Sequence, residues 1–193
     1  QDQAGAGNLT TSYAALQYAY SFNLAKHFSL RPGLQVAYAN RKIDYSRLVF
    51  GDQLGIEEIK ENTLEPQLED GITYIDFSAS LMGIYQKYWF GFTFDHIAQP
   101  NNSLMADKTR IPIRKIVYMG TKFSIDTKIG KKRARETLYV MLHYNQQDNF
   151  NQALLGSYYT RQQYIFGLWY RGIPFLKTYD AYKNNDALVF MLG

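Results

Sequence analysis

A strict two-residue alternation is the feature that most limits what this chain can fold into. The run from Phe28 to Ala39 shows it almost without a break. Its small and weakly polar residues fall on one face, and the other face carries Phe28, Leu30, Pro32, Leu34, Val36 and Tyr38. Successive side chains of a strand point to opposite faces, whereas a helix repeats every 3.6 residues. The run is therefore predicted to be a β-strand with one apolar face.

The same pattern recurs along the chain and predicts an all-β, antiparallel sheet. Strands are expected at about 15–22, 28–39, 73–85, 88–95, 114–125, 137–144, 152–159, 163–171 and 186–193. The one helix-like stretch, 55–62, lies inside a long connection. Residues 1–193 are therefore expected to form a single β domain of about nine strands.

Connections of two lengths alternate between these strands. Tight ones are expected at 23–27, 86–87 and 160–162, and long ones at 45–72, about 97–112 and 172–185. The connection 126–135 is of medium length and belongs with the tight turns, whereas 145–149 is short where a long loop would fit the pattern. Strands of about ten residues, with tight turns at one end and long loops at the other, are typical of outer-membrane barrels. Lipid cannot satisfy an open sheet edge, so such a sheet must close.

Composition excludes several other classes of protein. The mean hydropathy is −0.34, and no run approaches the roughly 18 apolar residues that a membrane-spanning helix needs. The absence of Cys excludes disulfide scaffolds, thiolate metal sites and cysteine nucleophiles. The net charge of +4 comes from scattered Lys and Arg, so nucleic acid is not an expected partner. Neither a nucleophile elbow, a phosphate loop nor a zinc-protease motif occurs, and we expect no enzyme and no cofactor.

The same alternation would suit a soluble antiparallel barrel or sandwich, whose apolar face is turned inward. Two observations favour a membrane barrel. The less apolar face is rich in Ser, Gly, Ala, Gln and Thr, whereas a solvated exterior would carry Lys and Glu. Aromatic residues gather near the expected strand ends, at Tyr20, Phe22, Phe28, Tyr38, Tyr85, Tyr88, Trp89, Tyr144, Tyr158, Tyr159, Trp169 and Tyr170. Such aromatics are expected to form the interfacial girdles of a lipid-facing sheet.

Several stretches, taken together and in this order, carry a resemblance. They are 2–7 followed by 11–24, then 28–38, 45–54, 76–80 leading into 88–96, and 166–175. In the residue pattern of its strands and the order of its loops, the chain resembles the PorP/SprF family, outer-membrane proteins of the type IX secretion system of Bacteroidetes. Members of that family carry further strands before and after this region. The resemblance, like the odd strand count, implies that this chain is the middle and later part of a larger barrel.

The resemblance also implies a non-enzymatic role. Proteins of this family act with periplasmic ring and motor components, and help to export or anchor large surface adhesins, including gliding adhesins, through the C-terminal signal domain of the adhesin. On this basis the chain is expected in the outer membrane, in contact with its lipid. The long loops would face outside and the tight turns the periplasm.

Three groups of charged residues are candidate contact sites. The densest basic cluster, on the expected periplasmic side, could dock an acidic partner or be a solvated hairpin turn, and comprises Lys128, Lys131, Lys132, Arg133 and Arg135. The long connection 45–72 carries acids that could touch exported cargo, among them Asp52, Glu57, Glu58 and Glu61. Their spacing fits no calcium loop, and no metal site is assigned. The third group, expected to point into the lumen, is Arg31, Asp76 and Asp95.

Two functions of other classes remain open from the residues alone. A transport barrel for small hydrophobic ligands would hold a ligand-sized tunnel or bound lipid. A soluble β-barrel binding module would be extracted without detergent.

Overall fold

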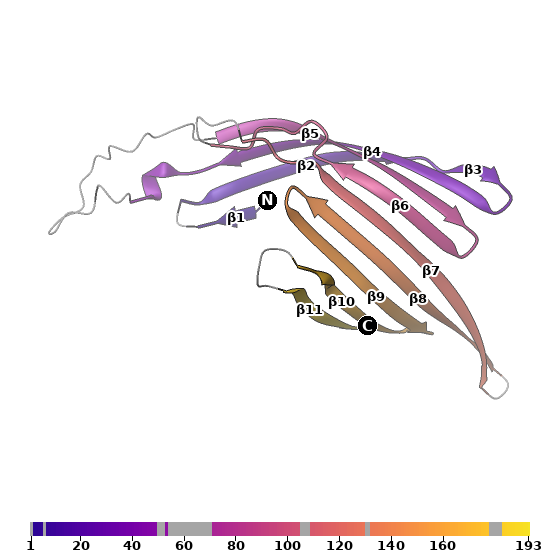
Figure 1. Cartoon of the computed structure of the whole chain (residues 1–193). Coiled ribbons are helices and arrows are strands. Elements are labelled where there is room, and N and C mark those ends of the chain that lie inside the picture. Colours follow the sequence, from indigo (N-terminus) through magenta and orange to yellow (C-terminus); the bar gives the residue numbers. More distant parts are fainter. Residues whose placement is uncertain are drawn as a thin grey trace. The chain divides into compact units, whose positions relative to one another are not determined.

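The computed structural model is an antiparallel sheet of 11 strands (Figure 1). It describes residues 2–5, 7–49, 53, 71–104, 109–129, 132–177 and 183–193, with side chains outside 126–135 and 173–186. The strands are β1 Asp2–Ala4, β2 Leu9–Ala19, β3 Phe22–Ala25, β4 Phe28–Lys42, β5 Gly71–Tyr85, β6 Tyr88–Asp95, β7 Arg114–Ile129, β8 Lys132–Gln147, β9 Phe150–Arg161, β10 Tyr164–Lys177 and β11 Lys183–Leu192. A short 3-10 turn, η1, covers Tyr45–Arg47.

Each strand pairs with its neighbour in the chain, in the order β1-β2-β4-β5-β6-β7-β8-β9-β10-β11, while β3 pairs with β4 beside this path. The predicted all-β antiparallel sheet is therefore confirmed. Within the described residues, β1 and β11 are not paired with each other. Closure of the sheet into a barrel stays a prediction.

All nine predicted strands are present, and the sheet adds the short strands β1 and β3. The tight turn at 86–87 is confirmed, the one expected at 160–162 lies at 162–163, and β3 occupies part of the one expected at 23–27. The short connection expected at 145–149 is reduced to 148–149, and the long one expected at 172–185 is wrong in extent, since β10 continues to Lys177 and β11 begins at Lys183. The medium-length connection at 126–135 is wrong, since β7 continues to Ile129 and β8 begins at Lys132. The sequence did not predict this hairpin, because its dense Lys and Arg leave no alternating apolar face, although the backbones of the two strands remain paired. The helix-like stretch 55–62 lies outside the described residues.

By contacts, the chain divides into two compact units. The first comprises residues 1–17, 35–77 and 96–112, and the second comprises 18–34, 78–95 and 113–193. In the first unit Val36, Tyr38, Ile75 and Phe77 are exposed, whereas the alternating residues Ala37, Ala39 and Asp76 are buried. The apolar side chains thus lie on the open face of this unit, and the small and polar ones on its packed face.

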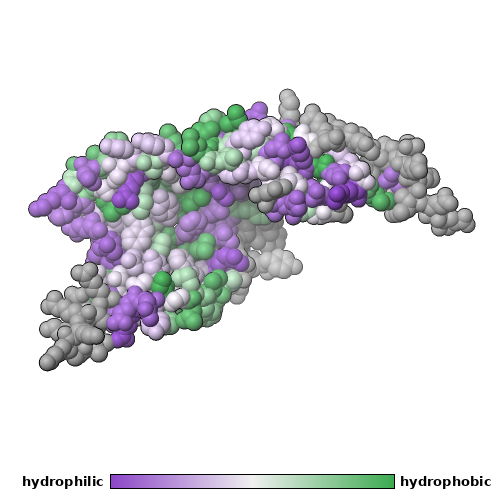
Figure 2. All heavy atoms as spheres, turned by 180° about the vertical axis from the view of Figure 1, so that it is seen from behind, coloured by the Kyte–Doolittle hydropathy of each residue, from purple (hydrophilic) through white to green (hydrophobic). Residues whose placement is uncertain are grey.

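The second unit repeats this arrangement on its own strands. Its exposed apolar residues, which we call the apolar face, include Phe90, Phe92 and Phe94 on β6, Val117 and Met119 on β7, Leu142 on β8, Leu155 on β9, and Phe166 and Leu168 on β10. The residues between them point to the opposite side, the polar face. In the view of Figure 2, green apolar residues lie among purple and near-white ones on the exposed surface. An exposed apolar surface of this extent marks a protein or membrane contact.

A capped turn begins the long connection after β4 in the first unit. The Asp44 carboxylate accepts hydrogen bonds from the Ser46 N–H (3.1 Å) and hydroxyl (2.5 Å), and the Asp44 N–H donates to the Gly7 carbonyl at 2.8 Å. The Ser46 hydroxyl is the main reason that the pKa of Asp44 is lowered, with Arg47 contributing. Local bonding of this kind fixes where the strand ends and the connection begins.

Candidate functional site

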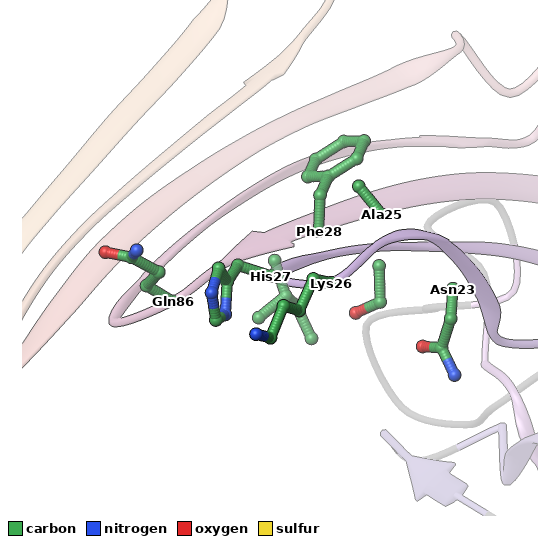
Figure 3. A pocket seen from close by; sticks show the side chains of 8 residues that line it. Asn23, Ala25, Lys26, His27, Phe28 and Gln86 are labelled. Carbon is green, nitrogen blue, oxygen red and sulfur yellow. The ribbon is translucent and has the colours of Figure 1, made fainter.

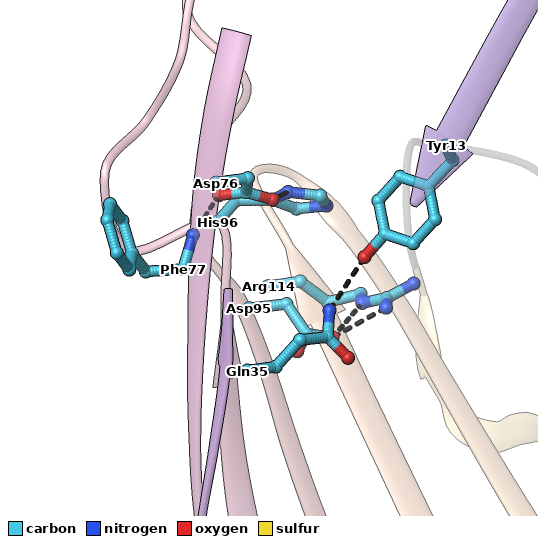
Figure 4. Close-up of polar contacts among 7 residues, drawn as sticks. All are labelled: Tyr13, Gln35, Asp76, Phe77, Asp95, His96 and Arg114. Atoms are coloured by element: carbon cyan, nitrogen blue, oxygen red, sulfur yellow. Dashed lines mark hydrogen bonds and ion pairs between the residues drawn. The ribbon is translucent and has the colours of Figure 1, made fainter. Parts of the chain in front are cut away.

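The predicted lumen residue Asp76 lies on the packed face of the first unit, with 3% of its surface exposed. Its carboxylate accepts a hydrogen bond from the Phe77 N–H at 2.9 Å, and its other oxygen lies 2.5 Å from His96 Nδ1 (Figure 4). His96 adopts a φ of 58°, and the following Ile97 N–H donates to the Phe77 carbonyl at 3.0 Å. These contacts hold the first residues of the 96–113 connection against β5.

Replacing Asp76 with Ala is expected to loosen this connection, because His96 and the Phe77 N–H both lose their acceptor. Leaving such groups unpaired costs about 1–3 kcal/mol. Limited proteolysis should show faster cleavage within 96–112. Ser78→Ala, which alters a buried polar residue two positions along β5, is the matched control. Equal cleavage of the two variants would contradict a specific role for the Asp76–His96 contact.

The second predicted lumen residue, Asp95, forms an ion pair in the second unit. It is directly opposite Arg114 in the β6–β7 register. Arg114 Nη2 and Nε both donate to Asp95 Oδ2, at 2.5 and 2.9 Å (Figure 4). The pair joins the two ends of the same long connection. Its partner Arg114 was not predicted, although the opposite charges flank a loop in the sequence.

The third, Arg31, lies on β4 in the second unit and is exposed. Its Nε donates to the Ser21 hydroxyl at 3.2 Å, and within the described part of the chain it forms no ion pair. Uncharged polar contacts are also present in the first unit. There Gln35 Nε2 donates to the Tyr13 hydroxyl at 2.6 Å, and Gln17 Nε2 donates to Gln35 Oε1 at 2.5 Å.

The predicted basic cluster lies on the β7–β8 hairpin. Lys128 is opposite Arg133, and Lys132 and Arg135 also lie in the hairpin register. Lys131 lies outside the described residues, as do the side chains of all five. The last pair with β6 is Tyr88–Thr121, and the last with β9 is Glu136–Arg161. The hairpin therefore extends beyond both neighbours from Asp126 and Arg135 onward, by roughly 14 Å at the usual rise of a strand (Figure 1).

The predicted acidic contact lies outside the described residues, which include neither Asp52 nor Glu57, Glu58 or Glu61. Among the residues that the structure does describe, no group of three or more His, Asp or Glu side chains could hold a metal ion.

The polar face of the second unit carries a pattern that was missed in the sequence, in which large rings alternate with glycines. A row of directly paired residues crosses five strands through Trp89, Gly120, Met141, Gly156 and Trp169. The Trp89 ring occupies the space that a Cβ at Gly120 would need, at 2.3 Å, and the Trp169 ring does the same at Gly156, at 2.2 Å. In the next row, the Tyr118 ring covers Gly91 in the same way, at 2.4 Å. Rings that cover strand glycines in this manner stabilise a curved sheet.

This face corrects part of the predicted aromatic girdle. Tyr20, Tyr38, Tyr85 and Tyr88 are exposed with the apolar residues, as expected. Trp89, Tyr158 and Trp169, by contrast, belong to the polar face, because each pairs with or covers a residue of that face. Position near a strand end does not decide the face. The face is decided by whether the residue stands at an odd or an even position along its strand. Trp89 lies between the exposed Tyr88 and Phe90 and therefore points to the opposite face.

Beside these rings the polar face is hollowed. Tyr139 and Tyr158 stack with their centroids 4.3 Å apart and an angle of 14°, and Trp89 is tilted against Tyr139 at 6.3 Å. The hollow has a volume of about 370 Å³. We call it the aromatic hollow; its lining is Met82, Ile84, Gln86, Lys87, Trp89, Lys122, Tyr139, Met141 and Tyr158.

A second hollow of about 620 Å³ adjoins the first at the β3–β4 and β5–β6 turns (Figure 3). It shares Ile84 and Gln86 with the aromatic hollow and is otherwise lined by Asn23, Ala25, Lys26, His27, Phe28 and Ser29. The Gln86 N–H donates to the His27 carbonyl at 3.1 Å, which ties the two turns together. Neither lining includes an Asp or Glu.

The model of the family described as type IX secretion system membrane protein PorP/SprF matches residues 1–193. The chain belongs to the PorP/SprF family. It is thus a membrane component of the type IX secretion system. Comparison with curated proteins and with solved structures found no match.

In the part of the chain that the structure describes, no helix is long and apolar enough to cross a membrane.

Proposed function

We propose that this PorP/SprF protein is an outer-membrane barrel that helps to export or anchor large surface adhesins through protein contacts, without catalysing a reaction. The observation that carries the proposal is the pairing of an exposed apolar face with a packed polar face on the same strands, in a chain of this secretion family. Lipid would cover the first face, and the second would line the lumen.

The connections suggest which end meets which compartment. The tight turns after β3, β5, β7 and β9 lie at one end of the strands, and the long connections 43–70 and 96–113 lie at the other. Outer-membrane barrels place short turns in the periplasm and longer loops outside. Accordingly, the basic hairpin would reach periplasmic ring or motor components, and the long acidic connection would meet exported cargo.

Deletion of the gene in a gliding host provides the test of this role. Surface adhesin should fall to background while its total amount in the cell persists, as measured by labelling of intact cells and by immunoblotting. The full-length gene supplied in trans should restore it. Normal adhesin delivery in the deletion strain would contradict the proposal.

The basic hairpin gives a sharper prediction. Reversing Lys128, Lys131, Lys132, Arg133 and Arg135 to Glu should lower surface adhesin on the order of tenfold, because an acidic partner surface would be repelled. The amount of protein in the outer membrane should stay normal, since the hairpin projects beyond its neighbours. The control is Lys115→Glu, the reversal of an exposed charge on β7 outside the projecting hairpin. Equal delivery by the wild type and the hairpin variant would exclude this hairpin as the contact.

A further inference from the structure

The aromatic hollow and its neighbour meet at the tight-turn end of the sheet, because they share Ile84 and Gln86. Every residue that lines them belongs to the second unit. A surface of this kind suits an extended segment of chain more than a compact ligand, since two hollows follow one another across the turns.

The aromatic hollow has the composition of a site for apolar side chains. Trp89, Tyr139 and Tyr158 present large, rigid rings, and such residues dominate the energetics of protein contacts. Met82 and Met141 add flexible, polarisable side chains that adapt to differently shaped partners. The volume of about 370 Å³ is within the range of about 300–1,000 Å³ that binding pockets occupy.

The charges around this surface are of one sign. Lys122 lines the aromatic hollow, Lys26 lines its neighbour, and neither lining includes a carboxylate. The Lys87 ammonium lies over the Tyr88 and Phe123 rings instead, at 5.3 and 5.0 Å, so Lys122 is the cation for the aromatic hollow. Beyond Lys122 the same β-hairpin carries the basic cluster. These cations would strengthen the binding of a partner that carries negative charge.

We propose that this surface binds an acidic peptide segment of a partner protein, with one large apolar side chain of the peptide seated in the aromatic hollow and carboxylates beside it paired with Lys122 and Lys26. The inference deepens the proposed function, because it assigns the protein contact at the tight-turn end to one peptide chemistry.

The test uses the full-length native protein in lipid nanodiscs and fluorescein-labelled synthetic peptides of about 12 residues. One peptide alternates Glu with Leu and Phe. The second keeps the Glu residues but replaces the apolar ones with Ser, and the third keeps the apolar residues but replaces Glu with Lys. Fluorescence anisotropy should show saturable binding of the first peptide alone. Equal binding of all three, or of none, would overturn the inference.

Two variants locate the site. Lys122→Glu and Tyr158→Ala should each weaken binding of the acidic apolar peptide about tenfold. Lys122→Glu changes one exposed side chain and so keeps the test valid if Tyr158→Ala does not fold. The matched control is Lys115→Glu, an exposed residue on the same strand but the opposite face, which should bind like the wild type. Unchanged binding by Lys122→Glu would overturn the inference, as would saturable uptake of a fluorescent fatty acid without peptide binding.

The outcome is separable from that of the proposed function. Failure of the native protein to bind any peptide, in a host where gene deletion still blocks adhesin delivery, would overturn the inference and leave the proposed function standing. Peptide binding that is lost in Lys122→Glu, in a host where deletion leaves delivery normal, would support the inference and contradict the adhesin role.

Discussion

Phe92→Arg is expected to destabilise the membrane-inserted protein by about 2–4 kcal/mol, the cost of Arg near the bilayer midplane on the lipid face of a barrel. Phe92 lies in the middle of β6 on the apolar face, with 40% of its surface exposed. Its ring also contacts that of Phe94, with centroids 5.8 Å apart, and this contact would be lost. Urea-induced unfolding in lipid vesicles measures the difference.

The neighbouring residue provides the control for this prediction. Thr93 points to the polar face, where it pairs with Ile116. Thr93→Arg places the same charge one residue along the strand but away from lipid, and should cost clearly less than Phe92→Arg. If the two variants lost equal stability, the assignment of Phe92 to a lipid contact would be wrong.

Gly156→Ala is expected to destabilise the sheet by about 1–3 kcal/mol through overpacking. The new Cβ would lie 2.2 Å from the Trp169 ring, so the ring would have to leave its place over β9. Ala normally replaces a strand Gly at little cost or with a gain, because Gly weakens a strand. A loss of stability here would therefore report the ring itself. The same unfolding measurement applies.

Gly167→Ala is the matched glycine on the adjacent strand. Its added Cβ would lie 3.1 Å from Met191 Cβ and Cε, a contact that a shift of a few tenths of an ångström relieves, and we expect a smaller loss than for Gly156→Ala. Trp169→Ala should also relieve the penalty of Gly156→Ala, so that the two changes are not additive. Additive effects would show that the ring and the glycine do not depend on each other.

The sequence predicted the strands well because the period of two is a local property. Leu34, Val36 and Tyr38 alternate with small residues, and the structure exposes the first set. Prediction failed where a strand no longer alternates apolar and small residues but is still paired with the neighbouring strand. The β7–β8 hairpin beyond Ile125 is charged, yet its backbone remains paired to Ile129 and Lys132.

The candidate sites were predicted less completely, because they depend on register. Asp76 and Asp95 could be placed on the polar face from the alternation. Their partners could not be identified in the same way, because Arg114 lies opposite Asp95 on another strand and His96 follows the end of β6. The alternation of Gly120, Gly156 and Gly91 with aromatic rings is likewise visible only across strands. Glycine and Trp in adjacent predicted strands were the available signal, and pairing the strands in hairpin register would have found it.

The proposed function requires that alternate residues of each strand face lipid and lumen, and this can be measured directly because the chain contains no cysteine. Single cysteines at Val36, Phe92 and Leu168, and at Gln35, Thr93 and Gln152, would each carry a spin label in lipid vesicles. Collision rates with oxygen, which is enriched in lipid, and with a water-soluble nickel complex should alternate, the first three sites favouring oxygen and the second three nickel. Nickel access at Val36, Phe92 and Leu168 equal to that at the other three sites would contradict the account.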